Sequence, residues 1–107
     1  MGNQFLVAIF ISLFIGLNFS VSPVHAQAPQ IPPTVELKRD IVYATRDGVA
    51  LKMDICLPKN LKEQRPAVIF THGGGFRTGD KIALLEECLN VSKEGYIGAT
   101  VNYRLQS

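Results

Sequence analysis

Residues 67–76 (AVIFTHGGGF) decide how the chain is interpreted, because a short apolar run ends there in three consecutive glycines. Residues 67–71 have the length and composition of a buried strand, and a charged amphipathic run typical of a helix begins near Asp80. Glycines at a strand-to-helix junction carry no Cβ, so their backbone N–H groups are free to point at a ligand atom. The sequence therefore predicts a ligand-binding loop between this strand and this helix.

The residues before this stretch predict an antiparallel β-hairpin. Residues 35–45 favour one strand, and Asp47-Gly48 is a strong signal for a two-residue hairpin turn. Residues 49–57 alternate between apolar and polar side chains, so the return strand has one apolar face and one mostly polar face.

The residues after the glycines predict a β-α-β unit. Residues 81–93 form a helix in this prediction, with Asp80 as its N-cap and Gly95 as its stop signal. Its apolar stripe consists of Ile82, Leu84, Leu85, Cys88, Leu89 and Val91. Residues 96–103 (YIGATVNY) then favour a second buried strand, which a right-handed crossover places parallel to the strand at 67–71.

Single residues exclude two kinds of phosphate-binding loop. Gly74 and Gly79 have the spacing of a Walker A loop, but Asp80 stands where the lysine is needed. A dinucleotide fingerprint requires glycine or alanine where this chain has Thr78. A glycine-rich turn without a ligand remains the alternative.

Residues 72–76 (HGGGF), in this strand-to-helix context, resemble the HGGG-type oxyanion loop of α/β-hydrolase lipases and esterases. Residues 102–105 (NYRL) resemble the segment that closes the next strand in these esterases. The resemblance covers about residues 35–105. Within the family, the sequence is similar to the carboxylesterase and acetyl-xylan or feruloyl esterase-like branches. It implies the α/β class, and within it the N-terminal part of an α/β-hydrolase fold with an incomplete sheet.

The resemblance also implies a role for each loop residue. Gly74 and Gly75 would donate their N–H groups to the oxyanion, while His72, Gly73 and Phe76 would support the loop. No metal or cofactor is implied, and the partner of the whole enzyme would be an ester substrate. Arg104 is expected to be a structural ion-pair partner, with a substrate-binding role as the alternative.

The catalytic triad is missing from the sequence. No G-x-S-x-G motif follows the glycines, and Ser92 and Ser107 lie at no strand-to-helix elbow. Residues 35–107 are therefore expected to be a truncated N-terminal part of an exported serine carboxylic-ester hydrolase, inactive alone and prone to self-association through its uncovered sheet. The alternatives are part of an α/β-hydrolase-fold peptidase, or a non-catalytic secreted binding module.

The first 34 residues predict export. Residues 5–17 are a 13-residue apolar run, too short for a stable membrane span of about 20 residues. Val24-His25-Ala26 suits signal-peptide cleavage after Ala26, which makes residues 1–26 a signal peptide and residues 27–34 a proline-rich linker. The mature chain would be secreted or periplasmic. Residues 1–4 contain no Lys or Arg, so an uncleaved anchor is the alternative.

Charge and cysteine content narrow the function further. The net charge is only +2 and both signs are interspersed, which argues against nucleic-acid binding. No cluster of His and Cys suggests zinc. Cys56 and Cys88 are expected to be small buried apolar residues on a strand and a helix, so a disulfide between them is possible but not favoured.

Overall fold

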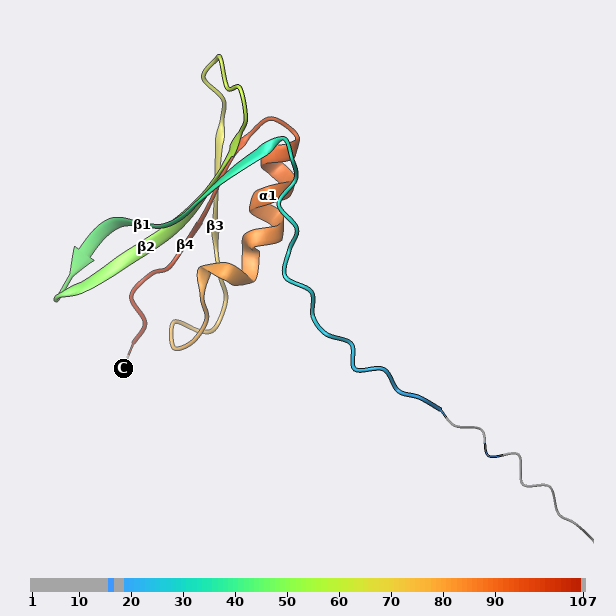
Figure 1. Cartoon of the computed structure of the whole chain (residues 1–107). Coiled ribbons are helices and arrows are strands. Elements are labelled where there is room, and N and C mark those ends of the chain that lie inside the picture. The colour runs from blue at the N-terminus through green and yellow to red at the C-terminus, as the bar shows by residue number, and fades with distance from the viewer. Residues whose placement is uncertain (1–15, 17–18, 107) are drawn as a thin grey trace, which may run out of the picture.

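The computed structural model describes Gly16 and residues 19–106, and these form one mixed sheet with a helix on one face (Figure 1). The elements are β1 (Val35–Arg46), β2 (Val49–Pro58), β3 (Ala67–Thr71), the 3₁₀ helix η1 (Lys81–Leu84), α1 (Leu85–Lys93) and β4 (Ile97–Val101). The strand order is β1-β2-β4-β3, with β3 parallel to β4 and the other pairs antiparallel. This confirms the predicted hairpin followed by a β-α-β unit in an incomplete α/β sheet.

The hairpin turn has the conformation that its sequence predicts. Asp47 and Gly48 both have positive φ, at 51° and 77°. Two left-handed residues in a two-residue loop match the right-handed twist of the strands they join. Further along the hairpin, β1 has an irregular register between Lys38 and Ile41, and Asp40 there also adopts a positive φ of 56°.

The predicted helix is found at residues 81–93, but its first turn is a 3₁₀ helix. Asp80 caps it as predicted, accepting a hydrogen bond from the Ile82 N–H at 2.9 Å. The prediction that Ile82 belongs to the buried stripe is wrong, because Ile82 is 53% exposed and Lys81 is buried instead. The tighter 3₁₀ turn has about three residues per turn, so its residues fall out of phase with the stripe of α1.

A glycine ends α1 as predicted. Gly95 has a φ of 96°, and its N–H donates to Ser92 O, while the Tyr96 N–H donates to Val91 O. These two bonds satisfy carbonyl groups of the last helical turn in a Schellman motif.

The core lies between α1 and the sheet, and a disulfide passes through it. Cys56 of β2 and Cys88 of α1 are both fully buried and covalently bonded, with Cα atoms 5.9 Å apart. The disulfide that the sequence left possible but did not favour is therefore present. Gly98 makes the close approach possible, because a Cβ there would stand 2.7 Å from Cys88 O. The helix can thus lie directly on β4, and Cys88 comes within reach of Cys56 on the neighbouring strand.

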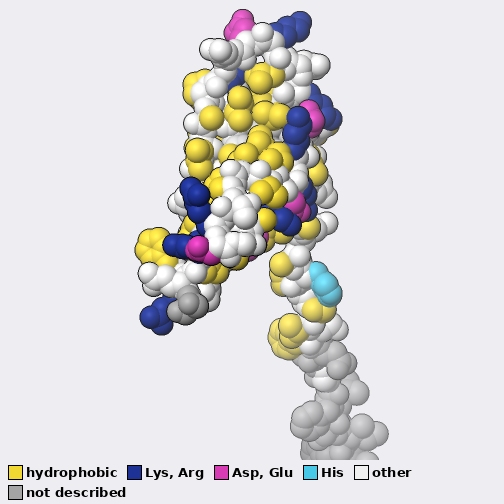
Figure 2. All heavy atoms as spheres, turned by 90° about the vertical axis from the view of Figure 1, so that its left-hand side faces the viewer, with side chains coloured by type: hydrophobic (Ala, Val, Ile, Leu, Met, Phe, Trp, Pro, Cys, Tyr) yellow, Lys and Arg dark blue, Asp and Glu magenta, His cyan; other side chains and the backbone are white. Residues whose placement is uncertain are grey.

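The helix covers the polar face of β2. Asp54 and Cys56 are fully buried, whereas Met53 and Ile55 on the apolar face are only half-buried. Ile69 of β3 is 67% exposed, and hydrophobic side chains gather on the face of the molecule opposite α1 (Figure 2). Among the described residues this apolar face has no covering layer.

The segment before β1 runs away from the sheet in an extended conformation (Figure 1). The proposed cleavage site after Ala26 lies in this segment, whereas the apolar run at 5–17, apart from Gly16, lies outside the described residues. The helices that the structure describes are all too short or too polar to cross a membrane.

Candidate functional site

The glycine loop, defined as residues 72–79, begins where β3 ends and leads into η1. The Gly74 carbonyl accepts hydrogen bonds from the N–H groups of Arg77 at 3.1 Å and Thr78 at 3.2 Å, which closes a tight turn. Three consecutive residues in this turn have positive φ, namely Gly74 at 122°, Gly75 at 60° and Phe76 at 62°. Phe76 is strained there, since a left-handed conformation costs a residue with a side chain about 1–3 kcal/mol.

Two loop positions have no room for a side chain. A Cβ at Gly74 would collide with the Thr78 carbonyl oxygen, and one at Gly79 would collide with the His72 ring. Gly75 has open space around it, but its positive φ disfavours any other residue. A Cβ at Gly73 would meet nothing within 4 Å.

The N–H groups of Gly74 and Gly75 are free for a ligand. In the described part of the chain neither donates a hydrogen bond to another protein group, and both residues are exposed. A pair of adjacent donors at the carboxyl end of a strand can bind an oxygen atom that carries negative charge.

Tyr103 holds the upstream end of the loop. Its hydroxyl donates to the His72 carbonyl at 2.7 Å, and its ring stacks on the His72 ring with centroids 4.4 Å apart. The Phe76 ring meets Tyr103 edge-on at 5.8 Å. The structure thus brings His72 and Phe76 of the predicted loop together around Tyr103, and the Gly73 carbonyl is hydrogen-bonded to the His72 ring.

The His72 side chain is turned toward its own loop. The residue is 6% exposed, and its Nδ1 lies 2.8 Å from the Gly73 carbonyl oxygen. A carbonyl only accepts, so Nδ1 carries the proton in this bond. The imidazole is therefore occupied with loop contacts on one edge and Tyr103 on its face.

Asn102 holds the downstream end of the loop. Its amide oxygen accepts from the Lys81 N–H at 2.6 Å, and its amide nitrogen donates to the Asp80 carboxylate at 3.0 Å. Hydrogen bonds from the Ile82 N–H and from Asn102 lower the pKa of Asp80 below its ordinary value of 3.8. The carboxylate therefore stays charged where it caps η1.

A partly buried charge cluster fastens η1 to the hairpin. Lys81 Nζ lies 2.8 Å from Asp54 Oδ1 and 3.1 Å from Asp40 Oδ1, and Asp54 is fully buried. Burial opposes the charge on Lys81, but its two carboxylate partners outweigh burial, so its pKa is raised above 10.5. The hydrogen bond from Lys81 and its charge lower the pKa of Asp40. Arg39 lies farther away, with Nε 3.6 Å from Asp54 Oδ2.

An open hollow of about 580 Å³ adjoins the loop. It is lined by Phe76, Leu105, Gln106 and the ion pair between Arg104 and Asp47. The predicted structural ion pair of Arg104 is therefore confirmed, with the hairpin turn as its partner. The Gln106 N–H also donates to the Phe76 carbonyl at 2.6 Å, so the residues after β4 form one wall of this hollow.

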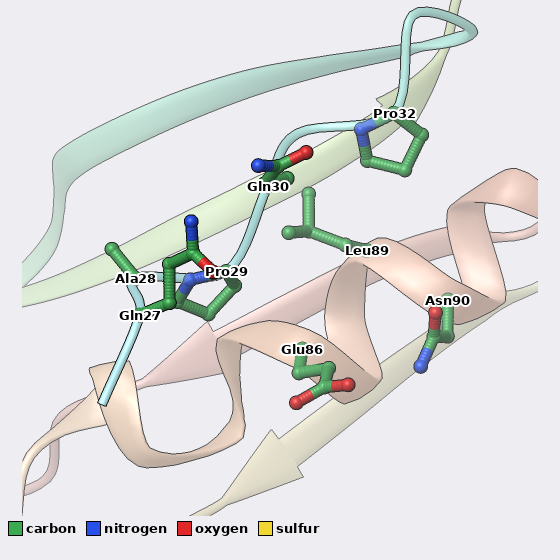
Figure 3. A pocket seen from close by; sticks show the side chains of 8 residues that line it. All are labelled: Gln27, Ala28, Pro29, Gln30, Pro32, Glu86, Leu89 and Asn90. Carbon is green, nitrogen blue, oxygen red and sulfur yellow. The ribbon is translucent and has the colours of Figure 1, made fainter. Parts of the chain in front are cut away.

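Other features of the described residues offer less chemistry. A second hollow of about 300 Å³ lies between residues 27–32 and α1, with Glu86 as its one ionisable side chain (Figure 3). Ser92 is 1% exposed on α1. No group of three or more His, Cys, Asp or Glu residues in the described part of the chain could hold a metal ion.

Sequence reasoning assigned no role in this network to Asp54, Lys81, Asn102 or Tyr103. Asp54 carried a weak signal, because it is an acid in the middle of a strand whose neighbours are largely apolar. Lys81 had none that distinguishes it from a surface residue. Tyr103 lies in the NYRL segment at the end of the predicted buried strand, but its contact with His72 depends on which strands become neighbours.

Comparison with known proteins places the chain among esterases. The model of the BD-FAE family, an α/β-hydrolase-type esterase domain, matches residues 53–107. Esterase 2 of Thermogutta terrifontis phosphorylated by paraoxon is 30% identical, with a TM-score of 0.59 over 72% of this chain and 29% of that one. Its native form is 31% identical, with a TM-score of 0.59 over 68% of this chain and 26% of that one.

A more distant structure shows the same fold. Esterase B from Lactobacillus rhamnosis is 24% identical, with a TM-score of 0.58 over 71% of this chain and 24% of that one. No curated protein matches the chain. The chain spans less than a third of the length of these esterases. Since the family model covers more than half of its residues, the chain belongs to the BD-FAE family of α/β-hydrolase-type esterases.

Proposed function

We propose that the glycine loop is the oxyanion-hole loop of an exported carboxylic-ester hydrolase, with Gly74 and Gly75 as the donors. The observation that carries this proposal is the pair of free N–H groups at the carboxyl end of β3. Attack on an ester places negative charge on the carbonyl oxygen, and fixed donors stabilise that charge. Each donor contributes about 2.7–4 kcal/mol to the transition state.

The relatives support an ester as the substrate class. Esterase 2 of Thermogutta terrifontis has been solved with propionate bound and after phosphorylation by paraoxon. Those structures are more than three times as long as the matched part of this chain, so most of such a domain has no counterpart here. We therefore propose that the nucleophile, acid and base lie outside these 107 residues and that the chain alone is inactive.

Two features support export. The apolar run at 5–17 is followed by a cleavage motif ending at Ala26, as signal peptides require. The disulfide between Cys56 and Cys88 is of a kind that forms in an oxidising compartment such as the periplasm or the extracellular space. Mass analysis of exported material should find Gln27 as the first residue, and an intact Met1 held in the membrane would show an uncleaved anchor instead.

An ester-hydrolysis assay of the 107-residue chain tests the proposal that the catalytic triad lies outside it. We expect no saturable turnover of p-nitrophenyl acetate above that of a heat-denatured sample. Turnover that a serine-directed acylating inhibitor abolishes would reveal a working nucleophile within the chain and contradict the proposal. Sequencing the gene beyond the Ser107 codon separates a hydrolase from a non-catalytic binding module, because G-x-S-x-G followed by Asp or Glu and then His supports the hydrolase.

Substitutions in any longer active product test the glycine loop itself. Gly74→Ala should lower kcat by roughly 10²–10³, because its Cβ collides with Thr78 and displaces a donor. Gly48→Ala is the matched control, since it adds a Cβ to a left-handed glycine of the hairpin turn, outside the glycine loop, where nothing lies within 4 Å. Equal activity of the two variants would remove the glycine loop from the mechanism.

A further inference from the structure

We propose that Asn102 and Tyr103 are positioning residues that hold the two ends of the glycine loop and thereby fix the direction of the Gly74 and Gly75 N–H groups. Their contribution to catalysis rests on the proposed function, whereas their effect on loop geometry does not. The two residues are consecutive in the chain and follow β4, and each contacts a different end of the loop.

The backbone of Asn102 is fixed by hydrogen bonds to the hairpin. Its N–H donates to the Lys52 carbonyl of β2 at 2.9 Å, and its carbonyl accepts from the Tyr43 hydroxyl of β1 at 2.6 Å. From this fixed backbone, the side-chain amide spans Lys81 and Asp80, which immediately follow the loop. The amide uses one donor and one acceptor at once, so neither a carboxylate nor an apolar residue reproduces both bonds.

Tyr103 fixes the other end. Its hydroxyl bond to the His72 carbonyl and its stack on the His72 ring set the point where the chain leaves β3. The His72 ring in turn lies where a Cβ of Gly79 would be, so the upstream end also fixes the downstream end by contact. Both ends of the glycine loop therefore contact residues that directly follow β4, namely Asn102 and Tyr103.

The hydrogen bonds within the glycine loop are too few to fix the direction of its N–H groups. Its backbone hydrogen bonds converge on the single carbonyl of Gly74. Phe76 has a left-handed backbone conformation, which a residue with a side chain keeps only where surrounding contacts stabilise it. Those surroundings are the Tyr103 ring and the Gln106 N–H, both from the segment after β4.

The test is the pH dependence of the glycine signals in Asn102→Asp. This change keeps the oxygen that faces Lys81 but replaces the donor toward Asp80 with a second carboxylate. Two carboxylates about 3 Å apart cannot both remain ionised without separating, so the loop end should shift at pH 7.5. Near pH 5 a shared proton restores a hydrogen bond, and the loop should return. The ionisable groups around this position are Asp80, Lys81, Asp40, Asp54, Tyr43 and His72.

The readout is ¹H–¹⁵N NMR of the full chain with ¹⁵N-labelled glycine. The Gly74 and Gly75 signals of Asn102→Asp should differ from wild type at pH 7.5 and approach it at pH 5, while Gly48 in the hairpin turn stays unchanged. Asn90→Asp makes the same chemical change at an exposed position of α1 and should leave the Gly74 and Gly75 signals in place. Gly74 and Gly75 signals that match wild type at both pH values, or deviate equally at both, would overturn the proposal.

Tyr103→Phe gives a second measurement if Asn102→Asp does not fold. It removes only the hydroxyl bond to His72 and keeps the ring stack. We expect the order parameters of Gly74 and Gly75 to fall from about 0.85 toward 0.6, and unchanged values would refute the role of Tyr103. Neither experiment involves a reaction, so a failure of the esterase proposal and a failure of this one are told apart.

Discussion

Removing the disulfide between Cys56 and Cys88 should cost this chain a large part of its stability. The bond joins β2 to α1 across 32 residues of sequence, and both sulfurs are fully buried. It therefore links the hairpin to the one helix that covers the sheet among the described residues. The perturbation is the set of variants Cys56→Ala, Cys88→Ala and the double variant.

The magnitude follows from the length of the closed loop. A cross-link removes entropy from the unfolded chain of about 2.1 + 1.5R ln n cal/mol/K, where n is the number of residues enclosed. For the 32-residue separation this gives about 3.7 kcal/mol at 25 °C. Small domains have a total stability of about 5–15 kcal/mol, so the loss is a substantial fraction.

Urea unfolding at low protein concentration, followed by circular dichroism, measures this effect. The midpoint should fall by more than about 1 M in each single variant, given slopes of about 1–3 kcal/mol/M. Since either single change already breaks the bond, the double variant should lose about 3.7 kcal/mol less than the two single losses added together. Strictly additive losses, or two free thiols in the denatured oxidised protein, would refute the reasoning.

Three further predictions concern charge and surface. Lys81→Met removes the nearest cation from buried Asp54 and leaves only the more distant Arg39, so it should cost about 3–5 kcal/mol in urea unfolding. The control Lys38→Met breaks an exposed pair and should cost less than about 1 kcal/mol. A pH series of thermal melts should show stability lost below pH 3.8, because Asp40 with its lowered pKa is then protonated. Stability should also be lost above pH 10.5, because Lys81 with its raised pKa then loses its proton. A melting temperature that is constant across both limits would contradict a stabilising role for this charge cluster. Sedimentation should show self-association that weakens in Ile69→Lys, because Ile69 is exposed on the uncovered apolar face; a monomer at all concentrations would contradict this.

Local sequence signals predicted the elements well, because each depends on neighbouring residues. Asp47-Gly48 specified the hairpin turn, Asp80 the start of η1 and Gly95 the end of α1. The last strand was predicted too long, at 96–103 instead of Ile97–Val101. Asn102 and Tyr103 have good strand sequence around them, but their side chains contact η1 and the glycine loop, and the backbone of Asn102 keeps one hydrogen bond to β2.

The features that sequence could not predict all depend on which elements become neighbours. The disulfide requires β2 to lie beside β4 under α1, and no local pattern encodes that order. The same holds for the choice of face on β2. Alternation correctly separated an apolar from a polar face, yet α1 covers the polar one, where Asp54 is paired with Lys81 and Cys56 is covalently bonded.

The candidate site is more non-local than the motif that identifies it. The glycines lie together in the sequence, but the contacts that hold the site join residues 31 positions apart for Tyr103 and His72, 57 for Arg104 and Asp47, and 59 for Asn102 and Tyr43. Each contact involves the segment directly after β4. The loop therefore has these contacts only in the folded sheet, where β4 pairs with both β2 and β3.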